Sequence, residues 1–338
     1  FDGEELYLGG VMEHIEEAGI HSGDSSCTLP PITLGPDIIA KVKDATEKIA
    51  RGTGVRGLIN IQFAYVSENL YVIEANPRAS RTVPFVSKAT GVQMAKAAVL
   101  IGLGKSIAEL KAEGYLPSNM DGASLPEETA IAVKAAVLPF ARFRTPEGVV
   151  VDSLLSPEMR STGEVMGLDK HYDTAFAKAQ AGAGSPLPTS GKVFISVANH
   201  DKRNVIIYAK MLESLGFEIV STGGTAEILR RNGLNSVIVA SKFAEANGDH
   251  SIVDMVRNGD IDLILNTPAG GAARSDGYEI RAAAVSVGCP VMTTISEFAA
   301  AVQAINALRE HSWDIMSLQE HGVQLAAAVD ARSEGGEA

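Results

Sequence analysis

Cysteine is scarce in this sequence, and its scarcity excludes two classes of site. Only Cys27 and Cys289 occur among 338 residues, and they lie far apart, without the spacing of a metal-ligand pair. The sequence therefore has neither a disulfide framework nor a cysteine zinc motif, and both thiols are expected to be packing residues. Such cysteine usage is typical of the reducing cytoplasm.

Long apolar runs and surplus basic charge are also lacking. No apolar run reaches the roughly 18 residues that a membrane span requires, and no signal-peptide pattern opens the chain. The 29 Lys and Arg residues are outnumbered by 41 Asp and Glu residues, which gives a net charge of −12. Because a nucleic-acid surface needs clustered Lys and Arg, we expect a cytoplasmic protein that binds neither nucleic acid nor membrane. Any anion that it binds must be met by local groups.

The chain has no initiator methionine, and its opening Phe1-Asp2-Gly3 is no ordinary domain start, so we expect a piece of a longer polypeptide. Its length suggests roughly two domains. The uncharged stretch QAGAGSPLPTSG, which ends at Gly191, predicts a linker. We therefore expect a first domain over residues 1–180, a linker over 181–191, a second domain over 192–329 and a disordered tail over 330–338.

The two predicted domains differ in their hydrophobic pattern. The first begins with an amphipathic helix over 36–51, which Gly52 is expected to end, and continues with a hairpin, a helix over 93–103 and a strand over 131–138. In the second, apolar strands alternate with helices, which predicts a parallel sheet covered on both faces. These strands are expected over 192–198, 217–222, 236–240, 262–267 and 290–294. The fold class is therefore a mixture of α+β and α/β, the second domain being doubly wound.

Polar residues interrupt the predicted hairpin between residues 58 and 76. The runs 58–66 and 70–76 are rich in β-branched and aromatic residues, and residues 67–69 supply a turn. Pairing about Glu68 sets Gln62 opposite Glu74 and Asn60 opposite Asn76. Because side chains alternate between the faces of a strand, these four polar residues share one face. The other face is expected to be apolar, with Ile61, Phe63, Tyr65, Tyr71 and Ile73.

The polar face of this hairpin has the oxygen ligands of a hard cation. Gln62, Glu74 and Asn76 offer carbonyl and carboxylate oxygens without sulfur or imidazole, a set that suits Mg²⁺ also held by phosphates. Arg78 and Arg81 follow directly, and the guanidinium group is well shaped to bind phosphate oxygens. The alternative is the solvent-facing side of an ordinary hairpin, because exposed strand faces are commonly polar.

A second anion site is predicted in the second domain. The stretch STGGT, residues 221–225, lies between a strand and a helix, where glycines allow close backbone approach and helix N–H groups face an anion. Other polar groups are expected at the same edge of the sheet. Each lysine alone could equally be a solvated surface residue, but the grouping favours a small phosphorylated ligand. The candidate residues are Lys202, Thr222, Gly224, Thr225, Lys242, Asn266 and Thr267.

Three long motifs resemble the large subunit of carbamoyl-phosphate synthase. They are EHIEEAGIHSGDSSCTLPP, VIEANPRASRTVPFVSKATG and PEMRSTGEVMG, at residues 13–31, 72–91 and 157–167, and the resemblance is collinear over nearly the whole chain. The first part resembles the carboxyl-terminal lobe of the second ATP-grasp unit, an antiparallel sheet with helices, which phosphorylates carbamate. The second part resembles the regulatory domain, which has a methylglyoxal-synthase-like fold.

The resemblance implies an activity, cofactors and partners. The reaction makes carbamoyl phosphate from bicarbonate, two ATP and either glutamine or ammonia, for pyrimidine and arginine synthesis. It implies Mg²⁺ or Mn²⁺, K⁺, a glutaminase small subunit, an oligomer of heterodimers and a UMP-type effector. Because most of the nucleotide-binding portion of the second unit is lacking, this chain alone is expected to be inactive.

The resemblance also implies roles for individual residues. Gln62, Glu74 and Asn76 match magnesium ligands, the first two in contact with the bound nucleotide, and Arg78 and Arg81 match positions near the transferred phosphoryl group. The nucleotide-contacting loop matches Gly19, Ile20, His21 and Ser22, and the neighbourhood of a potassium site matches His14, Glu16 and Ser25.

The chain departs from the family at effector positions. Ala135 and Val291 stand where members that ornithine activates have an acidic residue and a tyrosine, although Glu16 and Asp24 of that site remain. Pro268 stands where some relatives place a threonine in the nucleotide pocket, which leaves the identity of the effector open.

Three alternative functions remain open. The chain could be a binding or regulatory module only. It could instead be a methylglyoxal synthase, with Asp249 as the catalytic base, or another ATP-grasp ligase such as a biotin carboxylase relative. The collinear regulatory domain argues against the last of these.

Overall fold

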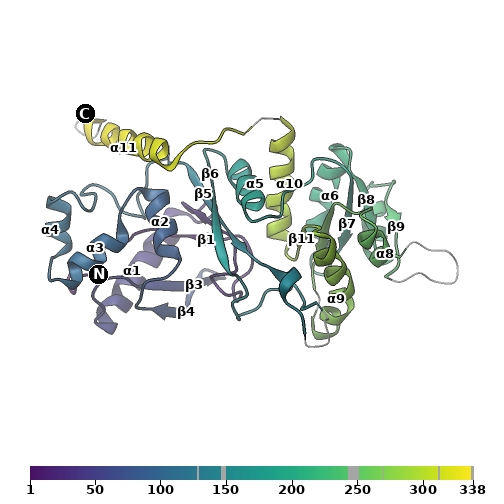
Figure 1. Ribbon diagram of the computed structural model, residues 1–338, viewed down its shortest axis with the longest axis horizontal. Helices are drawn as coiled ribbons and strands as arrows, with labels where there is room; N and C mark the ends of the chain where they lie inside the picture. The colour runs from purple at the N-terminus through teal and green to yellow at the C-terminus, as the bar shows by residue number, and fades with distance from the viewer. Residues whose placement is uncertain (128, 146–149, 243–250, 269, 311–312, 336–338) are drawn as a thin grey trace.

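The computed structural model describes residues 1–127, 129–145, 150–242, 251–268, 270–310 and 313–335. Two sheets occupy the two halves of an elongated molecule (Figure 1). The first sheet is antiparallel, with the order β1-β2-β5-β6. Its strands are β1 (Glu13–His14), β2 (Cys27–Leu29), β5 (Ile131–Val137) and β6 (Gly163–Asp169). The strand predicted at 131–138 is thereby confirmed.

Helices and a hairpin complete the first half. Helix α1 (Pro36–Thr53) precedes the hairpin of β3 (Asn60–Val66) and β4 (Asn69–Asn76), and α2 (Thr82–Thr90), α3 (Met94–Gly102) and α4 (Ile107–Ala112) follow. The prediction that Gly52 ends α1 is wrong, because Gly54 adopts φ 64° at the C-cap. Its N–H group donates to the carbonyl of Arg51, which satisfies a terminal acceptor of the helix.

The second half is a doubly wound parallel sheet, as predicted. Its order is β11-β10-β7-β8-β9, and all its neighbouring strands are parallel. The strands are β7 (Lys192–Ser196), β8 (Glu218–Ser221), β9 (Ile238–Val239), β10 (Leu263–Asn266) and β11 (Val291–Met292). The helices are α6 (Lys202–Ser214), α7 (Gly223–Arg231), α8 (Ile252–Arg257), α9 (Gly270–Val287) and α10 (Ile295–Glu310).

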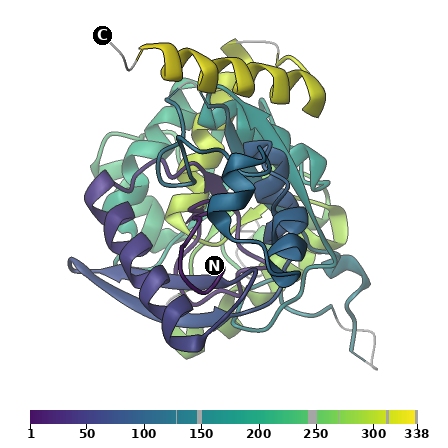
Figure 2. The same cartoon turned by 90° about the vertical axis from the view of Figure 1, so that its left-hand side faces the viewer.

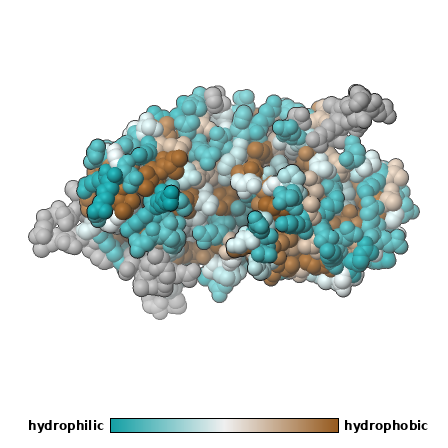
Figure 3. All heavy atoms as spheres, turned by 180° about the vertical axis from the view of Figure 1, so that it is seen from behind, coloured by the Kyte–Doolittle hydropathy of each residue, from teal (hydrophilic) through white to brown (hydrophobic). Residues whose placement is uncertain are grey.

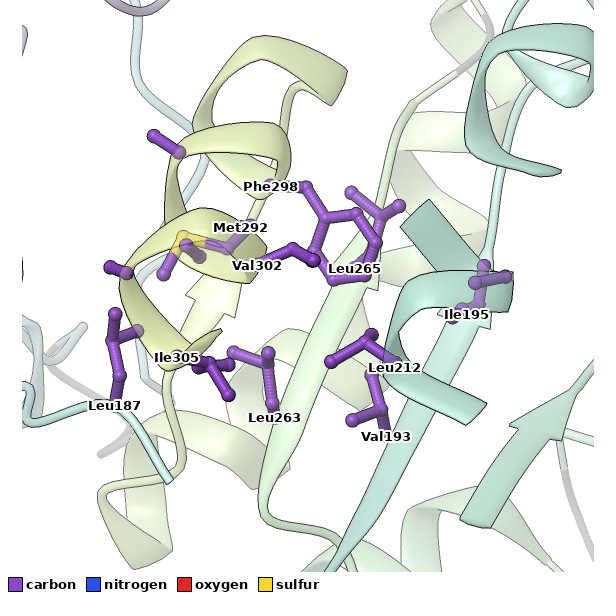
Figure 4. Packing of buried hydrophobic residues seen from close by; sticks show 14 of the residues in the cluster. Leu187, Val193, Ile195, Leu212, Leu263, Leu265, Met292, Phe298, Val302 and Ile305 are labelled. Carbon is purple, nitrogen blue, oxygen red and sulfur yellow. The ribbon is translucent and has the colours of Figure 1, made fainter. Parts of the chain in front are cut away.

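One hydrophobic core joins the two halves. Helix α5 (Tyr172–Gly182) packs between β6 and α10, and its buried Phe176 belongs to the same cluster as Val133 of the first sheet and Leu263 of the second. Leu187, within the predicted linker, is also buried in this cluster (Figure 4). Residues 181–191, predicted to be a linker, therefore include a residue packed into the core that the two halves share.

The carboxyl-terminal helix returns to the first half. Helix α11 (Leu318–Gly335) lies along the outside of α2 (Figures 1 and 2). His321 is buried and hydrogen-bonds the carbonyl oxygen of Ala89 through Nε2 at 3.1 Å, and Leu325 is also buried. The sequence predicts a disordered tail from residue 330, whereas α11 extends to Gly335. The first turns of α11 pack against α2, and this contact gives the helix a support that the polar composition of residues 330–338 does not reveal.

The surface is mixed in character. On the face that Figure 3 shows, apolar side chains form patches among polar ones. Among the helices of the described residues, none has the length and apolar content needed to cross a membrane.

Candidate functional site

The hairpin of β3 and β4 turns over two residues, not three as predicted. Ser67 and Glu68 have φ of 49° and 66°, the left-handed conformation that a tight two-residue turn requires. Val66 therefore pairs directly with Asn69, which belongs to β4.

A bulge restores the predicted pairing farther from the turn. The register shifts between Gln62 and Phe63, and the extra residue on β4 moves the pairing by one position. As a result, Gln62 lies opposite Glu74, and Asn60 lies opposite Asn76. Both predicted pairs of polar residues are confirmed.

The predicted apolar face of the hairpin is only partly correct. Phe63 pairs with Val72, whereas Tyr71 pairs with Ala64 and therefore lies on the opposite face from Phe63. Ile73 is the extra residue of the bulge. The tight turn and the bulge together cause this difference, because each shifts the alternation of side chains by one residue.

The predicted cation ligands have the chemistry of a shared magnesium site. Glu74 is exposed, whereas Gln62 lines a cavity of about 350 Å³ and donates from Nε2 to the carbonyl oxygen of Ile20 at 3.5 Å. Within the described residues, no cluster of three or more His, Cys, Asp and Glu side chains could enclose a metal ion. The single carboxylate and two amides fit Mg²⁺ or Mn²⁺ whose remaining ligands come from phosphates and water.

Residues from two distant segments of the chain hold the Arg81 guanidinium group in place. Its Nη2 donates to the hydroxyl of Ser161 at 2.6 Å and to the carbonyl oxygen of Gly23 at 3.3 Å. The Sδ atom of Met159 lies 3.3 Å from the same nitrogen. All three partners are uncharged, so they fix the position of the guanidinium group without neutralising its charge. Ser161 went unnoticed as a functional residue in the sequence, although it lies within the motif PEMRSTGEVMG.

Arg78 is placed differently. Its side chain is exposed, and Nη1 donates to the carbonyl oxygen of Ala79 at 3.1 Å. It lines a smaller cavity of about 120 Å³ together with Asn60. The two arginines therefore follow the same hairpin, but only Arg81 is anchored to the loop at residues 19–24.

That loop is tied to residues 156–161. Gly19 has φ 103°, a conformation that favours glycine, and the His21 N–H donates to the carbonyl oxygen of Ser156 at 2.9 Å. The buried carboxylate of Asp24 accepts hydrogen bonds from the N–H groups of Arg160 and Ser161, at 2.7 and 2.9 Å. The predicted nucleotide-contacting loop is thus rigidly attached to the segment that holds Arg81.

A buried lysine controls the charge beside this loop. Lys134, only 3% exposed, donates from Nζ to the carbonyl oxygen of Ser22 at 2.7 Å. Burial and this nearby ammonium group lower the pKa of His14 to about 4, so His14 is neutral at pH 7.

The predicted potassium neighbourhood is only loosely assembled. The Glu16 carboxylate is buried and accepts from the N–H group of Ser26 at 2.7 Å, and burial raises the pKa of this carboxyl group. Ser25 contacts the His21 carbonyl oxygen instead, at 3.5 Å.

The predicted anion site in the second half lies at the carboxyl edge of the parallel sheet. Helix α7 begins at Gly223, earlier than predicted, so Gly224 is in its first turn. A Cβ atom at Gly224 would lie 3.5 Å from Nζ of Lys202, which places this ammonium group beside the helix N-terminus. The free N–H groups of the helix and the lysine charge together favour an anion.

Hydroxyl groups of this site are linked to neighbouring strands. Thr222 Oγ1 lies 3.2 Å from Ser196 Oγ. The hydroxyls of Thr225 and Thr267 accept from the N–H groups of Val197 and Ala198, at 3.4 and 2.9 Å. The structure thus brings Lys202, Thr222, Gly224, Thr225, Asn266 and Thr267 to one edge.

Lys242 has a different partner. Its Nζ lies 2.8 Å from Oε2 of Glu279 on α9, so this lysine forms an ion pair with α9. Pro268 follows β10 at the edge of the sheet, whereas Asp249 lies outside the described residues.

A cavity of about 320 Å³ lies between the two halves. Ala135 and Val291 both line it, as do Glu16, Asp24 and Glu297. Burial, followed by repulsion from Glu16, raises the pKa of the Glu297 carboxyl group. The two apolar residues that depart from the ornithine-activated members therefore face the same space.

Comparisons with protein families identify both halves. The model of the carbamoyl-phosphate synthase L chain ATP binding domain matches residues 7–110, and that of the MGS-like domain matches residues 204–293. Among solved structures, the biotin carboxylase domain of a single-chain bacterial carboxylase is 18% identical, with a TM-score of 0.38 over 53% of this chain and 44% of that chain. A likeness at that level supports no shared function.

Sequence relatives match nearly the whole chain. Carbamoyl phosphate synthase large chains of Kocuria rhizophila, Micrococcus luteus and Streptomyces coelicolor are 70%, 66% and 59% identical over 95%, 97% and 98% of this chain. The chain spans 29% of the length of the first relative and 30% of the other two. With both halves and their order matched, the chain belongs to the carbamoyl phosphate synthase large-chain family, as a carboxyl-terminal portion with part of an ATP-grasp domain and an MGS-like domain.

Proposed function

We propose that this chain supplies the carboxyl-terminal lobe of the ATP-grasp unit that phosphorylates carbamate, together with a nucleotide-binding regulatory domain. The observation that carries this proposal is the hairpin in which Gln62 faces Glu74, next to Arg81 anchored on Ser161 and Gly23. This is an arrangement for holding phosphate oxygens, because it joins oxygen ligands for a cation to a fixed positive charge.

The side chains of this site have separable tasks. Glu74, Gln62 and Asn76 would hold Mg²⁺ or Mn²⁺, which when bound neutralises the phosphate charge of ATP. Arg81, fixed by uncharged partners, can stabilise negative charge that develops on the transferred phosphoryl group. No group of this site needs to act as a covalent nucleophile, because phosphoryl transfer requires mainly positioning and charge stabilisation. Arg78, which is exposed and lines a cavity with Asn60, would add a second positive charge for phosphate oxygens.

The family relationship supports the remaining features of the proposal. The whole synthase would combine ATP, bicarbonate and ammonia from a glutaminase small subunit in the cytoplasm, as an oligomer of heterodimers. K⁺ would bind near His14, Glu16 and Ser25. In the second half, the anion site beside Lys202 would take the phosphate of a nucleotide monophosphate such as UMP. The chain alone would not form carbamoyl phosphate, since an ATP-grasp site closes between two lobes.

The test is the partial reaction of this unit, the synthesis of ATP from ADP and carbamoyl phosphate. In a full-length large chain that carries this sequence, Glu74→Gln should lower the rate by about 100-fold or more. The reason is that a neutral amide binds a hard cation more weakly than a carboxylate does. The matched control is Glu68→Gln, which changes the exposed turn of the same hairpin. A near-normal rate for Glu74→Gln at ordinary magnesium concentration would contradict the assignment.

A further inference from the structure

A buried arginine joins the edge of the parallel sheet to the first half of the molecule. Arg281 of α9 is fully buried, and its Nη1 donates to Oδ1 of Asn266 at 2.7 Å. Its Nε and Nη2 donate to the two carboxylate oxygens of Asp152, each at 2.7 Å. Bidentate pairing of this kind fixes both distance and orientation. The guanidinium group therefore holds Asn266, at the predicted anion site, and Asp152, in the other half, in one rigid unit.

The surroundings are shaped for this contact. A Cβ atom at Gly277 would collide with both the Arg281 guanidinium group and the Asn266 side chain, so a larger residue there would displace the hydrogen bond between them. The hydroxyl of Tyr278, about one turn before Arg281, donates to the carbonyl oxygen of Val150 at 2.6 Å. Helix α9 therefore contacts residues 150–152 through two side chains, Tyr278 and Arg281. A buried charge that is paired and hydrogen-bonded in this way is costly to disrupt, which makes this contact a stable connection.

The chain that follows residues 150–152 makes hydrogen bonds that reach Arg81. After Asp152, the chain passes Ser156, whose carbonyl oxygen accepts from the His21 N–H group, and reaches Ser161, whose hydroxyl accepts from Arg81. The N–H group of Ser161 is in turn fixed by Asp24. Residues 152–161 therefore contact the anion-site edge through Arg281 at one end and the phosphate-binding arginine at the other.

We propose that Arg281 and residues 152–161 form the mechanical connection through which a ligand at the Asn266 edge changes the position of Arg81. The regulatory meaning of this connection rests on the proposed function. A ligand that contacts Asn266 strengthens the Asn266 contact to Arg281, and through Arg281 it also fixes the position of Asp152. Coupling requires that the ligand favour one of two positions of this segment, and the chain of contacts gives that preference a physical path.

The connection is tested first without any ligand, by hydrogen exchange on the chain itself. Asn266→Ala removes the acceptor for Arg281 Nη1, so amide exchange in residues 152–161 should become about tenfold faster, as expected for loss of one hydrogen bond to a charged group. Thr267→Ala is the matched control, because Thr267 lies next to Asn266 but bonds Ala198 instead. Equal exchange in residues 152–161 for the two variants would overturn the proposal.

A second experiment separates coupling from a merely structural contact. UMP binding is measured by calorimetry, and its effect on exchange in residues 152–161 is then compared between the unaltered chain and Asp152→Asn. We expect UMP to slow exchange about fivefold in the unaltered chain and to have no effect on this segment in Asp152→Asn, with the dissociation constant unchanged within threefold. The side chain of Asp152 is 30% exposed, and asparagine keeps one oxygen acceptor for the Arg281 guanidinium group, so the amide variant should fold with the charge pairing lost.

The outcomes of the two experiments are distinguishable. If UMP does not bind, the proposed effector function fails, while the comparison of Asn266→Ala with Thr267→Ala still decides whether the connection exists. If UMP binds and the exchange of residues 152–161 does not respond in the unaltered chain, the effector function stands and the proposed coupling is wrong.

Discussion

Arg81 and Ser161 lie 80 positions apart in the chain, yet Nη2 of the arginine donates to the serine hydroxyl at 2.6 Å. The same hydroxyl donates to the carbonyl oxygen of Gly23 at 2.9 Å, and this carbonyl also accepts from Arg81. Three segments of the first half therefore meet at one guanidinium group. This convergence makes the position of Arg81 a property of the folded sheet and not of its own flexible side chain.

Ser161→Ala should therefore reduce phosphoryl transfer without removing substrate binding. Loss of the hydroxyl leaves Arg81 with the longer bond to Gly23, and a loosely held charge stabilises the transition state less well. We expect kcat for ATP synthesis from ADP and carbamoyl phosphate to fall about tenfold, with KM changed less than threefold. Ser156→Ala, on the same segment, is the control, because its hydroxyl accepts from the local Glu158 N–H group and not from Arg81. A parallel change in both variants would argue against a specific role for Ser161.

Phosphate binding in the second half should depend on Lys202. Its ammonium group lies beside the first turn of α7, where a phosphate would accept from the helix N–H groups. Lys202→Ala should weaken UMP binding about tenfold, and added salt should reduce the difference. Calorimetry on the complete chain measures this affinity. Lys210→Ala, at an exposed position of α6, the helix that also carries Lys202, should bind UMP normally. An unchanged affinity in Lys202→Ala would place the phosphate elsewhere.

Much of the local structure could be predicted from the sequence because it depends on short-range patterns. Continuous apolar strands separated by helices determine the parallel sheet, and the Gly-Gly turn before α7 indicates a helix N-terminus. The pairing of Gln62 with Glu74 was also predictable, although the prediction included neither the two-residue turn nor the bulge. The tight turn at Ser67 and the bulge beside Phe63 shift the register in opposite directions, so two local errors cancel at that pair.

The contacts between distant segments could not be predicted in the same way. Arg281 shows no pattern in the sequence that would mark it as buried, because its partners Asp152 and Asn266 come from other elements. Leu187 belongs to a stretch whose composition is that of a linker, yet it is buried in the shared core. Such residues are defined by tertiary packing, which propensity and periodicity do not contain.

The two carboxyl groups of the cavity between the halves predict a dependence of stability on pH. Burial raises the pKa of both Glu16 and Glu297 above the value of an unfolded glutamic acid. The folded chain thus retains protons that the unfolded chain releases, and this contribution to the free energy of unfolding is lost as pH rises through the folded pKa. The unfolding temperature should therefore fall between pH 6 and pH 9.

Glu297→Gln should remove part of this loss. At pH 8.5 we expect its unfolding temperature to exceed that of the unaltered chain by about 2–4 °C, and the difference should shrink at pH 5.5, where the carboxyl group is protonated in the folded state. Calorimetric melting at both pH values measures the effect. Glu158→Gln is the control, since the side chain of Glu158 is 79% exposed. A stabilisation by Glu297→Gln that is equal at both pH values would contradict the assigned cause.

The docking of α11 on α2 is expected to depend on a single buried leucine. Leu325 is 5% exposed. Truncation of a buried leucine to alanine lowers the free energy of unfolding by about 2–5 kcal/mol. We expect this loss to exceed the free energy that holds a single surface helix on the rest of the fold. In Leu325→Ala, α11 should open locally while both sheets remain folded, so amide exchange should rise in residues 318–328 and hardly change in β7 or β10. Trp313, the only tryptophan of the sequence, lies just before this helix and should shift its emission to longer wavelength. Val323→Ala tests whether the effect is specific, because Val323 lies on the same helix but is 71% exposed.

If both variants open α11 equally, the helix is held by something other than the Leu325 contact. If neither does, the His321 bond to Ala89 suffices, and His321→Ala should then produce the opening alone.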